Sequence, residues 1–273
     1  MEILLGVMRV SKKYCPWPWP KAILVFKDNK VTYNGYRSDL EEIGKKYFVS
    51  YLFNKNKYKT LWNLWEDLVK QYYKMAKVLE AINFKELSDK ALSTLYKNFH
   101  QFIDFFCNIV HVPEIANYGG EPWLLRRLKK INIGKAEEYL EILLAPVKCS
   151  FFQQEELDLL NLASIKNNKL FKIALAEHTQ KYHWLLNSYG GNRILNEKYF
   201  YRQLKNLLFK ITPTLKKQIV QQITETKKKK KNLVKKLKLP RDIQLAVDQL
   251  SHTIWWRKIY ARVIFGVCNI MKI

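Results

Sequence analysis

The sequence contains few glycine and proline residues, 9 and 8 among 273. Both residue types interrupt helices and are frequent in folds built from many tight turns. Their scarcity argues against a turn-rich β fold and favours long helices. Aromatic residues make up 14% of the chain, which excludes a disordered protein and is enough for a packed core. The length allows one large domain or two small ones.

The sequence also lacks paired cysteines and the short motifs of common enzymes. The four cysteines are far apart, with no CxxC pair, so we expect no zinc site and predict buried free thiols of a reducing compartment. They are Cys15, Cys107, Cys149 and Cys268. No Gly-rich phosphate loop, dinucleotide fingerprint, HExxH or GxSxG motif is present. The sequence therefore predicts no catalytic residue, no metal site and no cofactor in this chain.

Long apolar runs are missing as well. No stretch of about 20 apolar residues is available to span a bilayer. The apolar segment at residues 259–273 is short and is interrupted by Arg262, Asn269 and Lys272. The first ten residues, MEILLGVMRV, have neither the charged start nor the cleavage site of a signal peptide. We therefore expect a soluble cytoplasmic protein without a membrane partner.

Acidic residues are outnumbered two to one, 24 against 48 basic residues, which gives a net charge of +24. Clustered basic side chains neutralise phosphates, so this excess favours a nucleic-acid partner. However, the basic residues are 39 Lys and only 9 Arg, and arginine is the usual choice for bidentate phosphate contacts. Lysine spread over most of the chain is equally typical of a lysine-biased proteome, and both interpretations stay open.

The N-terminal part carries the only clear β pattern. Residues 22–27 (AILVFK) and 31–36 (VTYNGY) are rich in β-branched and aromatic residues, and Asp28-Asn29-Lys30 between them favours a turn. The sequence predicts a β-hairpin within a segment covering residues 1–37, joined by residues 4–10. The preceding Pro-Trp-Pro-Trp-Pro (residues 16–20) must be extended. We expect its tryptophans to attach the segment to the helices; a proline-motif ligand is the alternative.

From Ser38 onward the pattern predicts a helical domain, residues 38–273. Ser38 and Glu41 have the spacing of a capping box. Pro113 and the Gly119-Gly120 pair are expected to close the helix that Ser88 begins. Helices are expected to follow that first one at 58–82, 88–112, 122–130, 135–144, 151–165, 170–186, 197–209, 213–237 and from 241 onward. The predicted fold class is mainly α, an irregular multi-helix bundle with a small N-terminal β-hairpin.

A run of five lysines is the strongest local charge feature: Lys227, Lys228, Lys229, Lys230 and Lys231. The wider segment 210–238 holds eleven lysines and one glutamate. It is either a phosphate-binding arm or the solvated face of a long helix. No aromatic residue lies between Lys210 and Pro240, so base stacking is excluded there.

Arg126 and Arg127 follow Pro122 at the predicted start of a helix. A helix N-terminus and guanidinium groups together suit an anion. Adjacent residues point about 100° apart on a helix, so at most one of the two faces any site. An ordinary surface pair is the competing interpretation.

Residues 178–189 are unusually rich in polar aromatic side chains. The candidates for binding are His178, Tyr182, His183, Trp184 and Tyr189. The two histidines are five residues apart, which separates them by about 140° around a helix and disfavours a shared metal. The stretch is either a satisfied structural network or a wall that faces a ligand.

Two stretches resemble a known family. Residues 143–160 contain LLAP and SFFQQEELDLL, and residues 178–189 read HTQKYHWLLNSY. In this order and spacing they look like the helical region that precedes the mobile domain of phosphoenolpyruvate-utilizing, PEP synthase-like enzymes. Residues 27–48 and 87–99 are similar to the earlier part of such proteins.

The resemblance implies a part of a phosphotransferase rather than a complete one. The family moves phosphate between ATP, a catalytic histidine and pyruvate, and that histidine lies in a glycine-rich motif ending in Ser-His-Ala. Here Ser251-His252-Thr253 has no preceding glycines, so no catalytic residue is carried over. ATP and Mg are implied only for a complete enzyme. The expected function is a non-catalytic helical module that docks a swivelling phosphohistidine domain from a neighbouring gene; the alternative is a lysine-rich, helical nucleic-acid-binding protein.

Overall fold

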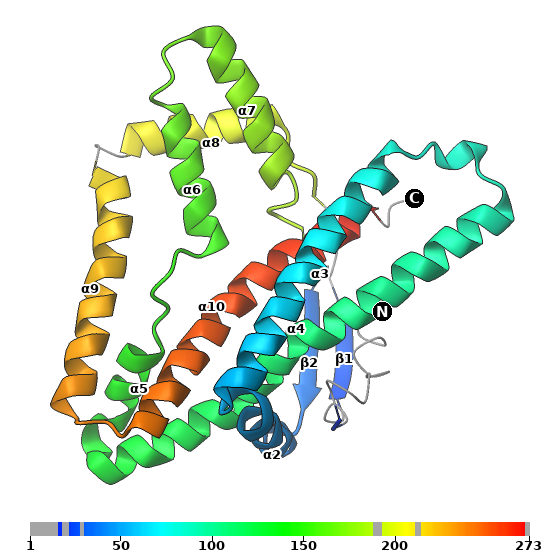
Figure 1. Cartoon of the computed structure of the whole chain (residues 1–273). Coiled ribbons are helices and arrows are strands. Elements are labelled where there is room, and N and C mark those ends of the chain that lie inside the picture. The colour runs from blue at the N-terminus through cyan, green and yellow to red at the C-terminus, as the bar shows by residue number, and fades with distance from the viewer. Residues whose placement is uncertain (1–15, 18–21, 28–29, 188–192, 211–213, 271–273) are drawn as a thin grey trace.

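Helices dominate the structure, as the sequence predicts. The computed structural model describes residues 16–17, 22–27, 30–187, 193–210 and 214–270, and these residues form nine α-helices and one pair of strands (Figure 1). Strand β1 (Ala22–Lys27) pairs antiparallel with β2 (Lys30–Gly35), with Ala22 opposite Gly35. The hairpin is confirmed. The turn residues 28–29 and the predicted third segment, residues 4–10, lie outside the described residues.

Helix α2 (Arg37–Tyr47) begins two residues earlier than a capping box with Ser38 as the N-cap predicts. Tyr36 is the N-cap and no side chain caps this end, so the predicted capping role of Ser38 is wrong. The physical reason lies in Glu41, whose carboxylate pairs with Arg37 at 2.9 Å instead of accepting from the backbone N–H of Ser38. A short π-helix (Phe48–Leu52) follows, and α3 (Lys55–Ala81) begins at an Asn54 cap.

Helix α4 (Asp89–Ile131) is one continuous helix of 43 residues, and it corrects two predictions. Neither Pro113 nor the Gly119-Gly120 pair ends it, and the separate helix predicted for 122–130 is its last part. The reason is tertiary packing. A Cβ on Gly119 would lie 1.9 Å from the backbone nitrogen of Lys45, so the glycine lets α2 cross α4 at close range. The buried crossing offsets the cost of a proline within the helix.

The remaining helices agree closely with their sequence signals. They are α5 (Ala136–Leu144), α6 (Phe151–Leu162), α7 (Asn168–Tyr182), α8 (Glu197–Lys210), α9 (Thr214–Lys236) and α10 (Arg241–Ile270). Ser88 caps α4, and Ser150 caps α6 in a capping box with Gln153. Asn196 accepts a hydrogen bond from the Tyr199 backbone at the start of α8. Gly190, Gly191 and Pro213 lie outside the described residues.

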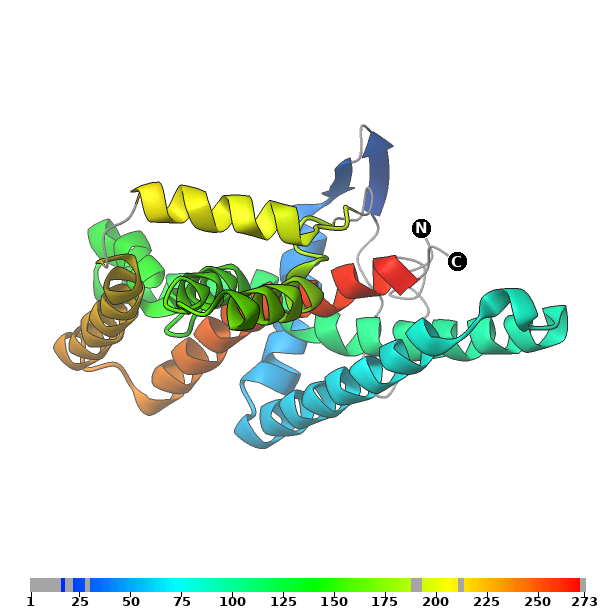
Figure 2. The ribbon, with the colours of Figure 1, turned by 90° about the horizontal axis from the view of Figure 1, so that it is seen from above.

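Two hydrophobic cores hold these helices together. The larger lies among α2, α3, α4, α5 and α10 and buries Phe106 and Trp256 completely. The smaller joins α6, α7 and α8 around Tyr182 and Phe200. Figure 1 shows α6–α8 gathered at one end, and the tip of the α3–α4 pair projects on the opposite side in both views (Figures 1 and 2). The fold therefore places residues 178–187 away from the main core.

Other sequence expectations concern single residues. Cys107 is a buried free thiol in the main core and Cys149 is partly buried. The Tyr47 hydroxyl donates to the carbonyl of Trp17 at 2.7 Å, so Trp17 attaches the N-terminal segment to α2 as predicted. Trp19 lies outside the described residues, and the proposed division at residues 37 and 38 stays a prediction. No described helix combines the length and apolar character that crossing a membrane requires.

Candidate functional site

A layer of polar contacts lies between α6 and α7. His178 Nε2 donates to Glu155 Oε1 at 3.1 Å, and the Tyr182 hydroxyl donates to Asp158 at 2.7 Å. Lys181 pairs with the same Asp158 carboxylate at 2.6 Å. Burial alone would raise the pKa of Asp158, but hydrogen bonds, first from Lys181 and then from Tyr182, hold it below its usual value. The layer joins residues 155–158 to residues 178–182.

The aromatic side chains of residues 178–187 also have internal partners. Trp184 donates its indole N–H to the carbonyl of Lys181 at 2.8 Å and packs against Phe151 with ring centroids 5.6 Å apart. His178, Tyr182 and Trp184 are all buried. This arrangement favours the structural network over the ligand-facing wall for these three side chains. Tyr189 lies outside the described residues.

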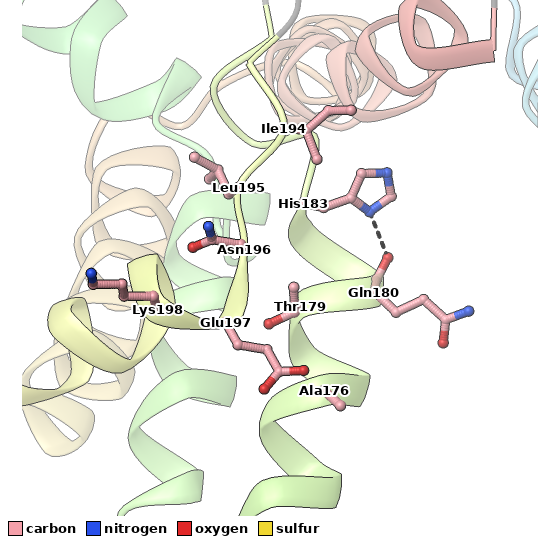
Figure 3. Close-up of a pocket in the computed structure, with 9 residues that line it drawn as sticks. All are labelled: Ala176, Thr179, Gln180, His183, Ile194, Leu195, Asn196, Glu197 and Lys198. Atoms are coloured by element: carbon pink, nitrogen blue, oxygen red, sulfur yellow. Dashed lines mark hydrogen bonds between the residues drawn. The ribbon is translucent and has the colours of Figure 1, made fainter.

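His183 lies on a different side of α7, at an open pocket of about 560 Å³. The pocket lies between α7 and the segment leading into α8, and Figure 3 shows Thr179 and Glu197 extending into it while His183 hydrogen bonds Gln180. The Thr179 hydroxyl is buried and has no partner among the described residues. Ile194 at the rim is 59% exposed. His178 and His183 therefore lie in different environments, in line with their predicted separation around the helix.

A second cluster, which the sequence did not indicate, surrounds His252 of α10. The Tyr58 hydroxyl of α3 lies 2.5 Å from His252 Nδ1, and Lys148 Nζ lies 3.3 Å from Nε2. An ammonium group can only donate, so Nε2 accepts and Nδ1 carries the proton. Burial, and then the Lys148 charge, lower the pKa of His252 to about 4, so the ring is neutral. Rings of Trp62 and Trp255 lie 4.6 and 5.1 Å from it, centroid to centroid.

The neighbours of His252 hydrogen bond to other helices of the fold. Ser251 donates to the carbonyl of Ala145 at 3.0 Å, and Thr253 donates to Asn117 Oδ1 at 2.7 Å. All three residues lie within α10, in the helical context expected from the sequence. They hold α10 against α4 and α5.

The five lysines of α9 are not equivalent. Lys227, Lys228, Lys229 and Lys231 are exposed, whereas Lys230 is buried. Burial lowers the pKa of Lys230 to about 8, and the charge of Asp248 on α10 partly opposes this shift. Helix α9 lies at the edge of the molecule (Figure 1). Four charges of the run therefore face solvent, and one takes part in packing.

Arg126 and Arg127 do not lie at a helix start, because Pro122 is inside α4. The predicted combination of a helix N-terminus with two guanidinium groups is therefore wrong. Arg127 stacks over the ring of Trp123, with its guanidinium carbon 3.7 Å from the ring centroid, and Arg126 is exposed. Their different environments agree with the expectation that only one could face a given site.

The described residues contain no group of three or more His, Cys, Asp or Glu side chains arranged to hold a metal ion. Comparison with known proteins adds no assignment: no family model, no curated protein and no solved structure matches this chain. The resemblance to PEP-utilizing enzymes therefore stays a prediction that depends on residues 143–160 and 178–189.

Proposed function

We propose that this chain is a non-catalytic helical module of a PEP-utilizing phosphotransferase and docks a swivelling phosphohistidine domain. The observation that supports the proposal is the contact between the two stretches that carry the resemblance. The first includes most of α6 and the second begins in the last turns of α7, and their polar side chains pair directly, His178 with Glu155 and Tyr182 with Asp158. The resemblance thus concerns one packed structural unit rather than two unrelated helices.

The open pocket beside His183 is the docking surface that we assign to this partner. It combines an apolar rim at Ile194 with the unpartnered hydroxyl of Thr179 and the carboxylate of Glu197. An apolar anchor surrounded by polar groups is the usual composition of a protein interface. The net charge of +24 favours a partner that carries phosphate.

The test begins with the neighbouring genes. A reading frame that encodes a glycine-rich Ser-His-Ala motif is expected nearby, and its product is titrated into this chain by calorimetry. Ile194→Asp should weaken binding about tenfold or more, because it places a charge in the apolar rim. Val78→Asp is the matched control, since Val78 is also exposed, at 60%, but lies on α3. Absence of such a gene, or no binding by its product, contradicts the proposal.

A second candidate function is nucleic-acid binding through α9. The specific observation is that Lys227, Lys228, Lys229 and Lys231 are exposed on one helix at the molecular edge. No aromatic residue that could stack on a base lies between Lys210 and Pro240, so the contacts would be to the phosphate backbone and independent of the nucleotide sequence.

A gel shift at several salt concentrations tests this second function. Four phosphate contacts predict that affinity falls about a hundredfold between 50 and 200 mM salt. Replacing the four exposed lysines of the run with glutamine should remove most of this dependence. Replacing Lys97, Lys166, Lys169 and Lys172, which are also exposed, is the control of equal charge. Equal loss in both variants would indicate only a general effect of net charge.

A further inference from the structure

A smaller cavity of about 230 Å³ lies where the α5–α6 connection passes between α9 and α10 (Figure 1). Its walls come from three places in the sequence. The connection supplies Lys148 and Ser150, α9 supplies Gln222 and Thr226, and α10 supplies Trp255. Only the folded chain brings these residues together, and the cavity is separate from the pocket at His183.

Lys148 brings a positively charged group to this cavity; burial lowers its pKa, and the charge of Glu66 on α3 partly opposes that shift. Its Nζ lies 4.1 Å from the ring centroid of Trp255 and 3.3 Å from His252 Nε2. His252 is neutral, and no carboxylate of the described residues lies within ion-pair distance of Lys148. The Trp255 ring and the imidazole both contact the ammonium group of Lys148, whose remaining hydrogens can still donate.

The other walls of the cavity supply polar groups that suit an anion. The first turn of α6 starts here, and Ser150 caps it by accepting a hydrogen bond from the Gln153 N–H at 3.2 Å. Gln153 uses its side-chain oxygen to accept from the Ser150 backbone at 2.9 Å, which leaves its amide N–H groups to donate. Gln222 adds a second amide from α9. A helix N-terminus beside a lysine attracts negative charge from two directions.

From these contacts we infer that the cavity binds the phosphate group of a small molecule, held by Lys148, the N-terminus of α6 and the amides of Gln153 and Gln222. The volume exceeds that of one phosphate group, so part of the carrier molecule fits as well. This inference does not depend on the proposed docking function, because it concerns a different face and different residues.

The experiment titrates the whole chain with inorganic phosphate and follows the ³¹P resonance, with acetate as a second probe. Wild-type protein should show saturable binding of phosphate. Lys148→Gln should weaken it about tenfold, which corresponds to about 1.4 kcal/mol. Lys205→Gln is the matched control, because Lys205 also lies over an aromatic ring, 4.7 Å from the Tyr201 centroid, but lines no part of this cavity.

The outcomes separate specific binding from general attraction to a basic protein. Loss in Lys148→Gln but not in Lys205→Gln supports the site, provided that both variants melt within a few degrees of the wild type. Gln222→Leu is a second test variant: it leaves the net charge unchanged and should also weaken phosphate binding. Equal weakening in both lysine variants, no saturable binding, or tighter binding of acetate than of phosphate would overturn the inference.

Discussion

His252 should make the stability of this protein depend on pH between about 6.5 and 4. Burial and the nearby Lys148 charge lower its pKa from 6.5 to about 4 in the folded state. Within this window the unfolded chain binds a proton that the folded chain does not. The contribution of neutral His252 to the free energy of unfolding is therefore complete above pH 6.5 and is lost as the pH falls toward 4.

The size of this effect follows from the shift. At pH 5 the unscreened difference amounts to about 2 kcal/mol in the free energy of unfolding. The ring is partly exposed, and solvent screening reduces this figure to about 1 kcal/mol. The groups around the ring come from three elements: Tyr58 from α3, Lys148 from the α5–α6 connection and Trp255 from α10.

Urea unfolding at pH 7.5 and pH 5.0 measures the effect. Protonation of the carboxylates also lowers the free energy of unfolding on acidification, but it does so equally in the wild type and in His252→Gln. The wild type should therefore lose about 1 kcal/mol more than this variant. His183→Gln, at the open pocket, should keep the full wild-type loss. Equal losses in the wild type and His252→Gln would refute the reasoning, as would a ring pKa near 6.5 measured by NMR.

Three further predictions concern packing and hydrogen bonds. Gly119→Ala should destabilise the protein by about 3 kcal/mol in urea unfolding, because the added Cβ would overlap α2. Gly134→Ala is the control: its Cβ would meet the nearest atom at 3.7 Å, and stability should change by less than about 0.5 kcal/mol. Tyr182→Phe should cost about 2 kcal/mol and raise the pKa of Asp158, which a ¹³C NMR titration of the carboxyl measures. Ser150→Ala removes the N-cap of α6 and should cost about 1 kcal/mol by thermal unfolding; no change would mean that the cap is dispensable.

Helix starts were predictable where the capping contact is local. Ser88, Ser150 and Asn196 cap helices as expected, because each hydrogen bond involves a residue three positions away. The same rule failed at Ser38, where Arg37 competes for Glu41. Local patterns therefore predict most elements, and a neighbouring charge is enough to move a boundary.

The errors at α4 and around His252 have a different cause. Gly119 resembles a helix breaker in the sequence, but its function depends on Gly44 and Lys45 in another helix. The Tyr58 and Lys148 contacts of His252 connect residues 194 and 104 positions apart. No local pattern carries such information, so the phosphate cavity could only be found in the folded chain.

The continuity of α4 has a mechanical consequence. A helix of 43 residues is about 65 Å long. Its second half, from Phe106 onward, is clamped in the main core, while its first turns near Asp89 are exposed and project with the end of α3. The helix is therefore held at one end only, and the two prolines inside it, Pro113 and Pro122, both lie in the held half. A force applied near Asp89 would turn α4 as one rigid rod and would therefore act on α5 and α10 at its other end.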